Sequence, residues 1–296
     1  MVAAADSEFV HPEVVPERDV FVALGHHLLP RPRVRTTRTL GMAPRFAFLD
    51  HPGPLAFAHR GGASAWPENT MPAFQGAVDL GYRYLETDVH LTADGVLVAF
   101  HDDRLDRVTD RVGVISELPY REVSKALVDG REPIPLFTDL LEAFPDTRIN
   151  IDPKNDDTVV PLARILVDTK SIDRVCIGAF SDRRIDRMRA LCGPALCTSM
   201  GPRRVARLVA AGRAGGKRTG RPPVAGAAQV PVRHGRLPLV TPAFVAAARR
   251  RQVQVHVWTI DDPAEMGELL DLGVDGIMTD QPQVLKDVLV ERGQWY

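Results

Sequence analysis

The residues most suited to chemistry lie where short apolar runs end. His59 and Arg60 follow such a run in AFAHRGGASAWPENT, and Gly61 and Gly62 come directly after them. Two cationic side chains beside a glycine pair suit an anionic ligand, since glycine allows the backbone to approach that ligand closely. A loop without function is the alternative, because a single histidine at a strand end is more often structural than catalytic.

A second group consists of acidic residues spaced by two. Glu86 and Asp88 occur in YLETDVH, and on a strand this spacing points both carboxylates to one face. Like charges so close cost stability, and a bound cation removes that cost. Oxygen ligands alone favour a hard cation such as Mg²⁺ or Ca²⁺. Asp152 and Lys154 repeat the spacing in INIDPK, although Asp152 could instead cap a turn. His101 ends a further short run, in AFHDD.

These residues must be positioned by an alternation of strands and helices. Helical patterns at 70–81, 202–212 and 263–273 separate several of the apolar runs. The predicted strands are 55–60, 83–90, 148–152, 174–180, 195–200, 224–230, 253–260 and 275–280. Eight strands alternating with helices predict an α/β fold of the TIM, or (β/α)₈, barrel type, in which polar residues at the carboxyl ends of strands are catalytic. A doubly wound open sheet is the alternative, because periodicity alone cannot show closure.

Three segments depart from this alternation. A turn signal in TADG predicts an additional strand at 96–101, followed by a polar insertion at about 102–135. A basic segment at 211–223 predicts a flexible loop. Residues 1–50, rich in proline and arginine, predict an N-terminal extension that is disordered in part, so the barrel domain would span 51–296.

Net charge and cysteine content indicate which binding partners and which cellular compartment to expect. A formal net charge of −1 predicts no bulk attraction to nucleic acid, and at most peripheral contact with a membrane. Three cysteines, and no apolar stretch typical of a secretory signal or a membrane span, predict reduced thiols in a cytoplasmic protein. The charge is uneven: from Arg187 to Ile260 there are 14 Lys or Arg and no Asp or Glu. This basic segment could face an anionic ligand. Alternatively, its charges could simply lie on solvent-exposed helix faces.

The motifs together resemble a known enzyme family. HRGG…PENT, YLETDVHLTADGVLVAFHDD, INIDPK and VHVWTIDDP…LLDLGVDGIMTDQP follow one another in the order found in glycerophosphodiester phosphodiesterases, over residues 54–292. The resemblance implies a TIM-barrel hydrolase that uses a divalent cation, Mg²⁺ or Ca²⁺, to cleave glycerophosphodiesters to sn-glycerol 3-phosphate and an alcohol. It places the metal ligands on Glu86, Asp88 and Asp152, and the two family histidines on His59 and His101.

The resemblance also implies roles for the basic residues. Arg60 and Lys154 would neutralise the phosphate, with His59 as the expected general base and His101 as the expected general acid. The attacking oxygen would belong to water or to the substrate's own glycerol 2-hydroxyl. Asp152 departs from the Glu-x-Lys that is common in the family, and its shorter side chain could weaken or alter metal binding.

Two further residues have both a functional and a structural interpretation. Glu68 would organise the phosphate-binding loop, or the segment ENT would only cap the following helix. Trp258 would pack against the glycerol moiety, or it would be a structural tryptophan.

Two other functions stay open at the level of sequence. One is a lysophospholipase D-like phosphodiesterase that acts on lysophospholipids, and the other is a binding protein built on a catalytically inactive barrel. A small-molecule phosphodiester is the expected partner in the favoured case, with the chain a monomer or a homodimer.

Overall fold

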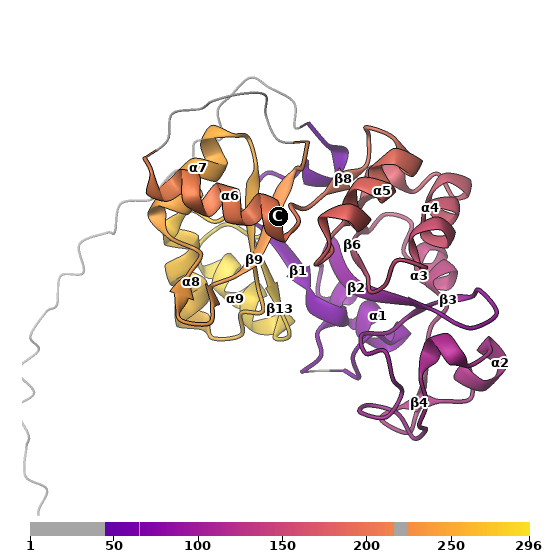
Figure 1. The fold of residues 1–296 in the computed structure, drawn as a ribbon. Coiled ribbons are helices and arrows are strands. Elements are labelled where there is room, and N and C mark those ends of the chain that lie inside the picture. Colours follow the sequence, from indigo (N-terminus) through magenta and orange to yellow (C-terminus); the bar gives the residue numbers. More distant parts are fainter. Residues whose placement is uncertain (1–44, 65, 216–223) are drawn as a thin grey trace, which may run out of the picture. The chain divides into compact units, whose positions relative to one another are not determined.

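The computed structural model describes residues 45–64, 66–215 and 224–296, and these form a barrel of parallel strands surrounded by helices (Figure 1). The barrel order is β8-β7-β6-β2-β1-β13-β12-β9, and every pairing along it is parallel. The strands are β1 (Leu55–Ala58), β2 (Tyr84–Leu91), β6 (Arg148–Pro153), β7 (Val175–Ile177), β8 (Cys197–Thr198), β9 (Ala227–Pro231), β12 (Gln254–Trp258) and β13 (Gly276–Thr279).

The two ends of this order meet beside β8. Ser199 forms a parallel bridge with Ala227. The Met200 amide also donates to the Ala227 carbonyl at 2.8 Å, and the Gly226 amide donates to the Thr198 carbonyl at 2.9 Å. These contacts join β8 to β9 and bring the eight strands round into a barrel. The fold predicted from the sequence is therefore confirmed, and each of the eight expected strands is present.

The helices begin at the caps and prolines that the sequence supplies. Thr70, Thr241 and Asp262 each accept a hydrogen bond from a backbone amide in the first turn of the helix that follows. A proline stands in the first turn of these helices, where its missing amide proton costs nothing. The barrel helices are α1 (Met71–Asp79), α3 (Phe137–Ala143), α4 (Val159–Asp168), α5 (Asp182–Cys192), α6 (Pro202–Arg213), α7 (Pro242–Arg250), α8 (Pro263–Leu272) and α9 (Pro282–Glu291).

An aromatic cluster fills the barrel at the amino end of its strands. Phe48 packs against Phe57 and Tyr84 with ring centroids 6.3 and 5.3 Å apart, and Tyr84 Oη donates to the Phe48 carbonyl. Phe48 belongs to a short 3-10 helix, η1 (Ala47–Leu49), that lies before β1. Phe46, Phe48 and Leu49 precede the predicted start of the barrel domain at residue 51, and they are buried in this cluster. Residues 1–44 of the predicted N-terminal extension lie outside the described residues.

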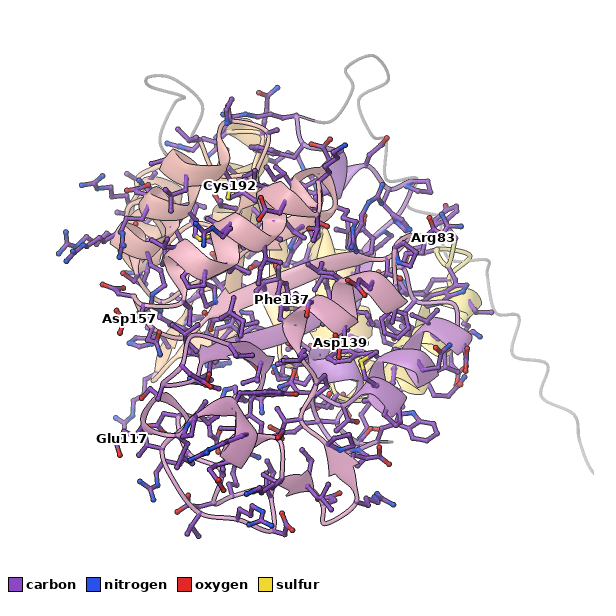
Figure 2. All side chains as sticks on the ribbon, turned by 90° about the vertical axis from the view of Figure 1, so that its right-hand side faces the viewer. Arg83, Glu117, Phe137, Asp139, Asp157 and Cys192 are labelled. Atoms are coloured by element: carbon purple, nitrogen blue, oxygen red, sulfur yellow. The ribbon has the colours of Figure 1, made fainter. Side chains whose placement is uncertain are left out.

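The segment after β2 is a folded insertion with its own small core. β3 (Leu97–Ala99) pairs antiparallel with β2 and is followed by η3 (Ile115–Glu117), α2 (Tyr120–Val123), β4 (Leu127–Val128) and β5 (Glu132–Pro133). Its buried residues are Val98, Phe100, Leu105, Ile115, Val123, Ala126, Val128 and Ile134. Figure 2 shows this part, marked by Glu117, below the helix that carries Phe137. The expectation of a merely polar segment missed this core, because its apolar residues are spread among many polar ones.

Two further sequence expectations concern a basic loop and a membrane-spanning segment. The basic loop expected at 211–223 begins within α6, and residues 216–223 lie outside the described residues. None of the helices in residues 45–64, 66–215 and 224–296 is long and apolar enough to cross a membrane.

Candidate active site

A cavity of about 1110 Å³ opens at the carboxyl ends of the barrel strands. It collects side chains from β2, β6 and β12 and from the segments after β1 and β3. The predicted site residues that line it are His59, Arg60, Glu86, Asp88, His101, Asp152, Lys154 and Trp258. Of the residues predicted from the sequence, Glu68 is the exception, and it contacts Arg60 instead.

A tight turn directs the first pair of site residues into this cavity. After β1 the chain enters η2 (His59–Gly61), where Arg60, Gly61 and Gly62 all adopt positive φ angles of 52°, 84° and 96°. A Cβ on Gly61 would lie 2.7 Å from Ala73 Cβ, and one on Gly62 would lie 2.6 Å from Pro282 Cγ. The glycine pair is therefore required for packing of the turn against α1 and α9, whatever it contributes to ligand binding.

His59 is held between two carboxylates. Its Nδ1 lies 2.7 Å from Asp280 Oδ1, and its Nε2 lies 3.8 Å from Glu86 Oε2. Burial acts to lower the pKa of His59, but the negative charges of Glu86 and Asp280 outweigh it and leave the pKa above its ordinary value. Asp280 was not predicted from the sequence, although it directly follows β13, at the same end of the barrel as the predicted residues.

The acidic residues of β2 and β6 lie side by side around the Lys154 ammonium group. Asp88 pairs in register with Asp152, and Lys154 Nζ lies 2.6 Å from Asp88 Oδ1 and 3.2 Å from Asp152 Oδ2. On its other side, Asp88 Oδ2 lies 3.5 Å from Arg60 Nε and accepts from Asn69 Nδ2 at 3.3 Å. Two cationic side chains therefore neutralise an otherwise repulsive group of carboxylates.

Burial makes this cluster electrostatically costly. Burial and the nearby charge of Asp88 raise the pKa of Glu86 to about 7. Burial also raises the pKa of Asp152, against the opposing effect of Lys154. Burial alone would lower the pKa of Lys154, but Asp88 and Asp152 raise it, so the ammonium form is favoured. The cluster thus favours additional positive charge.

His101 approaches the same cavity from the insertion side. It follows β3, and its Nδ1 lies 2.5 Å from Asp102 Oδ1. Asp102 in turn accepts two hydrogen bonds from the Arg107 guanidinium, at 2.6 and 3.0 Å. The bonds from Arg107 have the largest effect, and together with the bond from His101 they outweigh the opposing effect of burial and lower the pKa of Asp102 to about 2. Asp102 therefore stays ionised and orients His101.

Glu68 lies behind this cavity and connects two arginines. It accepts from Arg60 Nη1 at 3.0 Å and from Arg107 at 2.6 and 2.9 Å. Burial would raise the pKa of Glu68, yet the two guanidinium groups lower it overall. Within the segment ENT, Thr70 caps α1, as the structural interpretation of this segment expected, while Glu68 contacts the two arginines.

The chain is similar in sequence to proteins of a known family. Residues 59–284 match the model of the glycerophosphoryl diester phosphodiesterase family. A probable glycerophosphodiester phosphodiesterase of Mycobacterium tuberculosis is 40% identical over 258 residues, which cover 86% of this chain and 98% of that protein. The chain belongs to the glycerophosphodiester phosphodiesterase family. It is accordingly an enzyme, a phosphoric diester hydrolase.

The chain is also similar to more distant proteins. A human lysophospholipase D is 28% identical over 276 residues, covering 78% of this chain and 85% of that protein. A phosphodiesterase of Oleispira antarctica, solved in complex with the product sn-glycerol 3-phosphate, shares the fold with a TM-score of 0.68. It is 22% identical, and the match covers 80% of this chain and 97% of the other.

The three carboxylates that the family resemblance assigns to a metal fit a divalent cation by their chemistry. They supply only oxygen donors, and one of them, Asp152 Oδ1, is buried without a hydrogen-bond partner in the described part of the chain. In the described residues, no group of three or more His, Cys, Asp or Glu side chains is arranged closely enough to hold a metal ion without movement. Asp88 and Asp152 are instead turned toward Lys154.

The opposite side of the phosphodiesterase cavity is apolar. Trp258 packs edge-on against Phe180 with ring centroids 5.8 Å apart, and Phe180 is 71% exposed. Val205 and Val209 of α6 and Leu237 of the β10–β11 hairpin (β10, Arg233–His234; β11, Leu237–Pro238) continue this wall. In the barrel order, β9, which leads into the hairpin, lies four strands away from β2 in either direction, so the hairpin end of the wall faces the acidic residues of β2 across the barrel. Phe180 follows β7, which pairs with β6.

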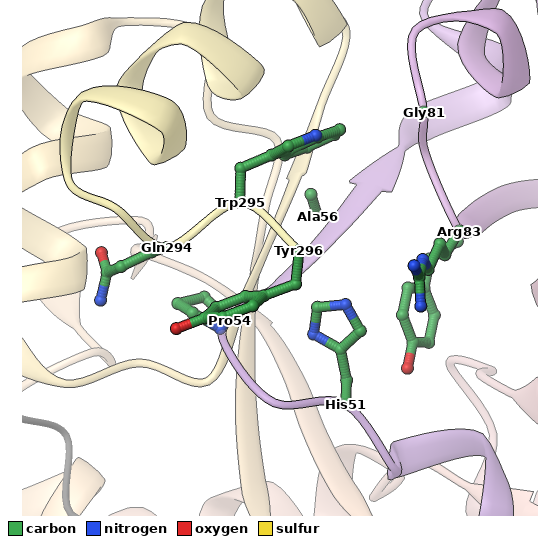
Figure 3. Close-up of a pocket in the computed structure, with 9 residues that line it drawn as sticks. His51, Pro54, Ala56, Gly81, Arg83, Gln294, Trp295 and Tyr296 are labelled. Atoms are coloured by element: carbon green, nitrogen blue, oxygen red, sulfur yellow. The ribbon is translucent and has the colours of Figure 1, made fainter.

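A second hollow lies at the other end of the barrel and is far smaller. It has a volume of about 10 Å³, which is no more than a single water molecule needs. Figure 3 shows His51 and Pro54, before β1, facing the C-terminal residues Trp295 and Tyr296 across it. Of these two hollows, the large cavity alone has room for a small-molecule substrate.

Proposed function

We propose that this enzyme hydrolyses glycerophosphodiesters to sn-glycerol 3-phosphate and an alcohol by metal-assisted acid–base catalysis. The observation that carries the proposal is the arrangement of His59 and His101 in one cavity with three carboxylates, Arg60 and Lys154. The related phosphodiesterase solved with sn-glycerol 3-phosphate supports the choice of product.

A divalent cation would be held by Glu86, Asp88 and Asp152, and when bound it would polarise and neutralise the phosphate. Formal charge supports this assignment. When Glu86 is ionised, the three carboxylates outnumber the cations of Arg60 and Lys154 by one, so the cluster without metal then repels a phosphodiester. A charge of two added to it reverses the sign and attracts the substrate. Arg60 and Lys154 then bind the phosphate oxygens and stabilise the more anionic transition state.

His59 takes a proton from the attacking oxygen at Nε2. Its Nδ1 is bonded to the Asp280 carboxylate, which fixes Nδ1 as the protonated nitrogen and leaves Nε2 as the acceptor. The Nε2 atom faces Glu86, so the attack takes place beside the acidic cluster. The attacking oxygen belongs to water or to the glycerol 2-hydroxyl, and release of a cyclic phosphate would identify the second.

His101 gives a proton to the leaving alcohol. Asp102 accepts from Nδ1, which leaves Nε2 as the nitrogen that serves the substrate. This assignment places the alcohol beside the insertion and the glycerol on the apolar side, toward Trp258.

The test is turnover of glycerophosphocholine by His59→Ala and His101→Ala in the presence of Mg²⁺ or Ca²⁺. Each substitution is expected to lower kcat by about 10²- to 10⁴-fold, the usual contribution of a general acid or base. Circular dichroism of both variants checks that the fold is unchanged. Full turnover by either variant would remove that histidine from the mechanism.

A second candidate substrate class, the lysophospholipids, is favoured by the apolar wall. The cavity is at the upper end of the size of small-ligand sites, and Val205, Val209 and Phe180 offer no polar partner to a bare glycerophosphate. A single acyl chain would bury these side chains. Competition between glycerophosphocholine and its 1-acyl analogue tests the idea, and Val209→Asp should lower kcat/KM for the acylated substrate more than for the other. An equal loss for both substrates would exclude the acyl site.

A further inference from the structure

Arg107, a residue of the insertion, binds two carboxylates that belong to different halves of the catalytic centre. Its Nε donates to Asp102 Oδ2 at 2.6 Å and its Nη2 to Asp102 Oδ1 at 3.0 Å. Its Nη1 donates to Glu68 Oε2 at 2.9 Å and its Nη2 to Glu68 Oε1 at 2.6 Å. All three nitrogens of one guanidinium group are thus engaged, each with a carboxylate oxygen.

One carboxylate orients the expected general acid. Asp102 holds His101 Nδ1 at 2.5 Å, so the position of Asp102 sets the direction in which His101 Nε2 points. The other carboxylate orients the phosphate-binding arginine, because Glu68 Oε1 accepts from Arg60 Nη1 at 3.0 Å. Arg60 has a competing partner in Asp88, 3.5 Å from its Nε, and Glu68 limits how far the guanidinium can turn toward it.

We propose that Arg107 is a positioning residue that holds the leaving-group acid His101 and the phosphate-binding Arg60 at a fixed distance from each other. The inference rests on the proposed function for the roles of these two residues. It also gives the folded insertion a purpose, since the insertion supplies Arg107 and the buried Leu105 beside it anchors the segment.

The chemistry of the guanidinium group explains why an arginine stands here. Its planar array of donors can bind two carboxylates in fixed directions, whereas a lysine ammonium is a single point charge. Hydrogen bonds from Arg107 are the largest of the effects that lower the pKa of Asp102, and they also act to lower the pKa of Glu68, so both acceptors stay ionised.

A purely structural role does not account for the contacts of Arg107. Its side chain is 47% exposed, and ion pairs at such exposure contribute little to folding stability. Arg104 offers a matched control in the same insertion. Its side chain is 49% exposed and forms an ion pair with Asp106.

Two substrates that share glycerophosphate but differ in the leaving group provide the test. Choline is a poor leaving group that needs protonation, whereas 4-nitrophenolate leaves without it. Arg107→Gln should lower kcat for glycerophosphocholine roughly tenfold to hundredfold, part of the usual contribution of a general acid, and kcat for the nitrophenyl ester much less. It should also raise KM for both substrates, through Glu68 and Arg60.

Single substitutions separate the two arms of the contact. Asp102→Asn should reproduce the dependence on the leaving group with little change in KM, and Glu68→Gln should reproduce the rise in KM alone. Arg107→Lys should recover only a part of the lost activity, because it restores the charge without the planar array. Arg104→Gln should match the unsubstituted enzyme on both substrates.

The outcomes distinguish this inference from the proposed function. If His101→Ala loses turnover of glycerophosphocholine while Arg107→Gln behaves like Arg104→Gln, the positioning role is wrong and the mechanism stands. An equal fall in kcat on both substrates, together with a lower melting temperature, would also overturn it in favour of a structural role. Full turnover by His101→Ala would instead remove the proposed acid.

Discussion

Asp88 and Asp152 lie directly opposite each other on β2 and β6, and Lys154 Nζ contacts both, at 2.6 and 3.2 Å. The ammonium group therefore does in this structure what a bound cation would do, which is to offset the repulsion of two buried carboxylates. Since Lys154 is also a proposed phosphate ligand, substrate and carboxylates compete for it. A divalent cation would resolve the competition, because it would bind the carboxylates and release Lys154 for the phosphate.

Lys154→Met should make the protein depend on metal for stability. Without the ammonium, Asp88 and Asp152 repel each other in a buried site, and a cation that binds only the folded state would offset this. We expect Mg²⁺ or Ca²⁺ to raise the melting temperature of Lys154→Met more than that of the unsubstituted protein. Thermal unfolding with metal and with chelator measures the difference. Lys286→Met of α9, whose ammonium group lies over the Trp295 ring and outside the cavity, serves as the control. An equal shift in all three proteins would contradict the prediction.

Asp152→Asn should weaken metal binding, whereas Asp152→Glu should preserve it. Asp152 has a buried oxygen, Oδ1, with no hydrogen-bond partner in the described part of the chain, which suits a metal ligand. The amide keeps the size but loses the charge, and the glutamate restores the residue that is common in the family. The metal concentration for half-maximal activity should rise tenfold or more in Asp152→Asn. If Asp152→Asn and the unsubstituted enzyme needed the same metal concentration, Asp152 would be excluded as a metal ligand.

Residues at strand ends could be predicted from the sequence because one rule fixes their place. In a parallel barrel all carboxyl ends meet at one face, so His59, Glu86, Asp88, Asp152 and Trp258 converge once the strands are recognised. The number and order of strands followed from the alternation of apolar runs and helices in the same way.

The residues that orient this site could not be found by that rule. Asp280 contacts His59 across 221 residues of sequence, and Arg107 contacts Glu68 across 39. Such pairings depend on where a turn and an insertion are folded, which periodicity does not encode. The buried η1 and the core of the insertion were missed for a related reason, because their few apolar residues follow no regular spacing.

Asp280→Asn should lower kcat with little effect on KM. Asp280 accepts from His59 Nδ1 and leaves Nε2 free to take a proton, whereas an asparagine can present its NH₂ group and favour the opposite tautomer. We expect kcat for glycerophosphocholine to fall by at least about 10²-fold, at the lower end of the contribution of a general base. Steady-state kinetics measure this, with exposed Asp287→Asn of α9 as control. An unchanged kcat would show that Asp280 does not set the state of His59.

His256 should make the folded barrel less stable as the pH falls below about 6.5. Its side chain is completely buried between Phe57, 5.1 Å away, and the neutral amides of Gln229 and Gln254. Burial lowers its pKa from 6.5 to about 3, so between these values only the unfolded state binds the proton. Each pH unit in this window should therefore lower the free energy of unfolding by about 1.4 kcal/mol through His256.

Comparison with His256→Gln isolates this contribution, because the carboxylates titrate alike in both proteins. Urea unfolding at pH 7, 6, 5 and 4 should show the free energy of unfolding falling less steeply with acidification in the variant than in the unsubstituted protein. The variant is expected to be less stable at pH 7, since glutamine fills the space less well, and to lose that disadvantage on acidification. Parallel curves over the whole range would mean that His256 becomes protonated without unfolding.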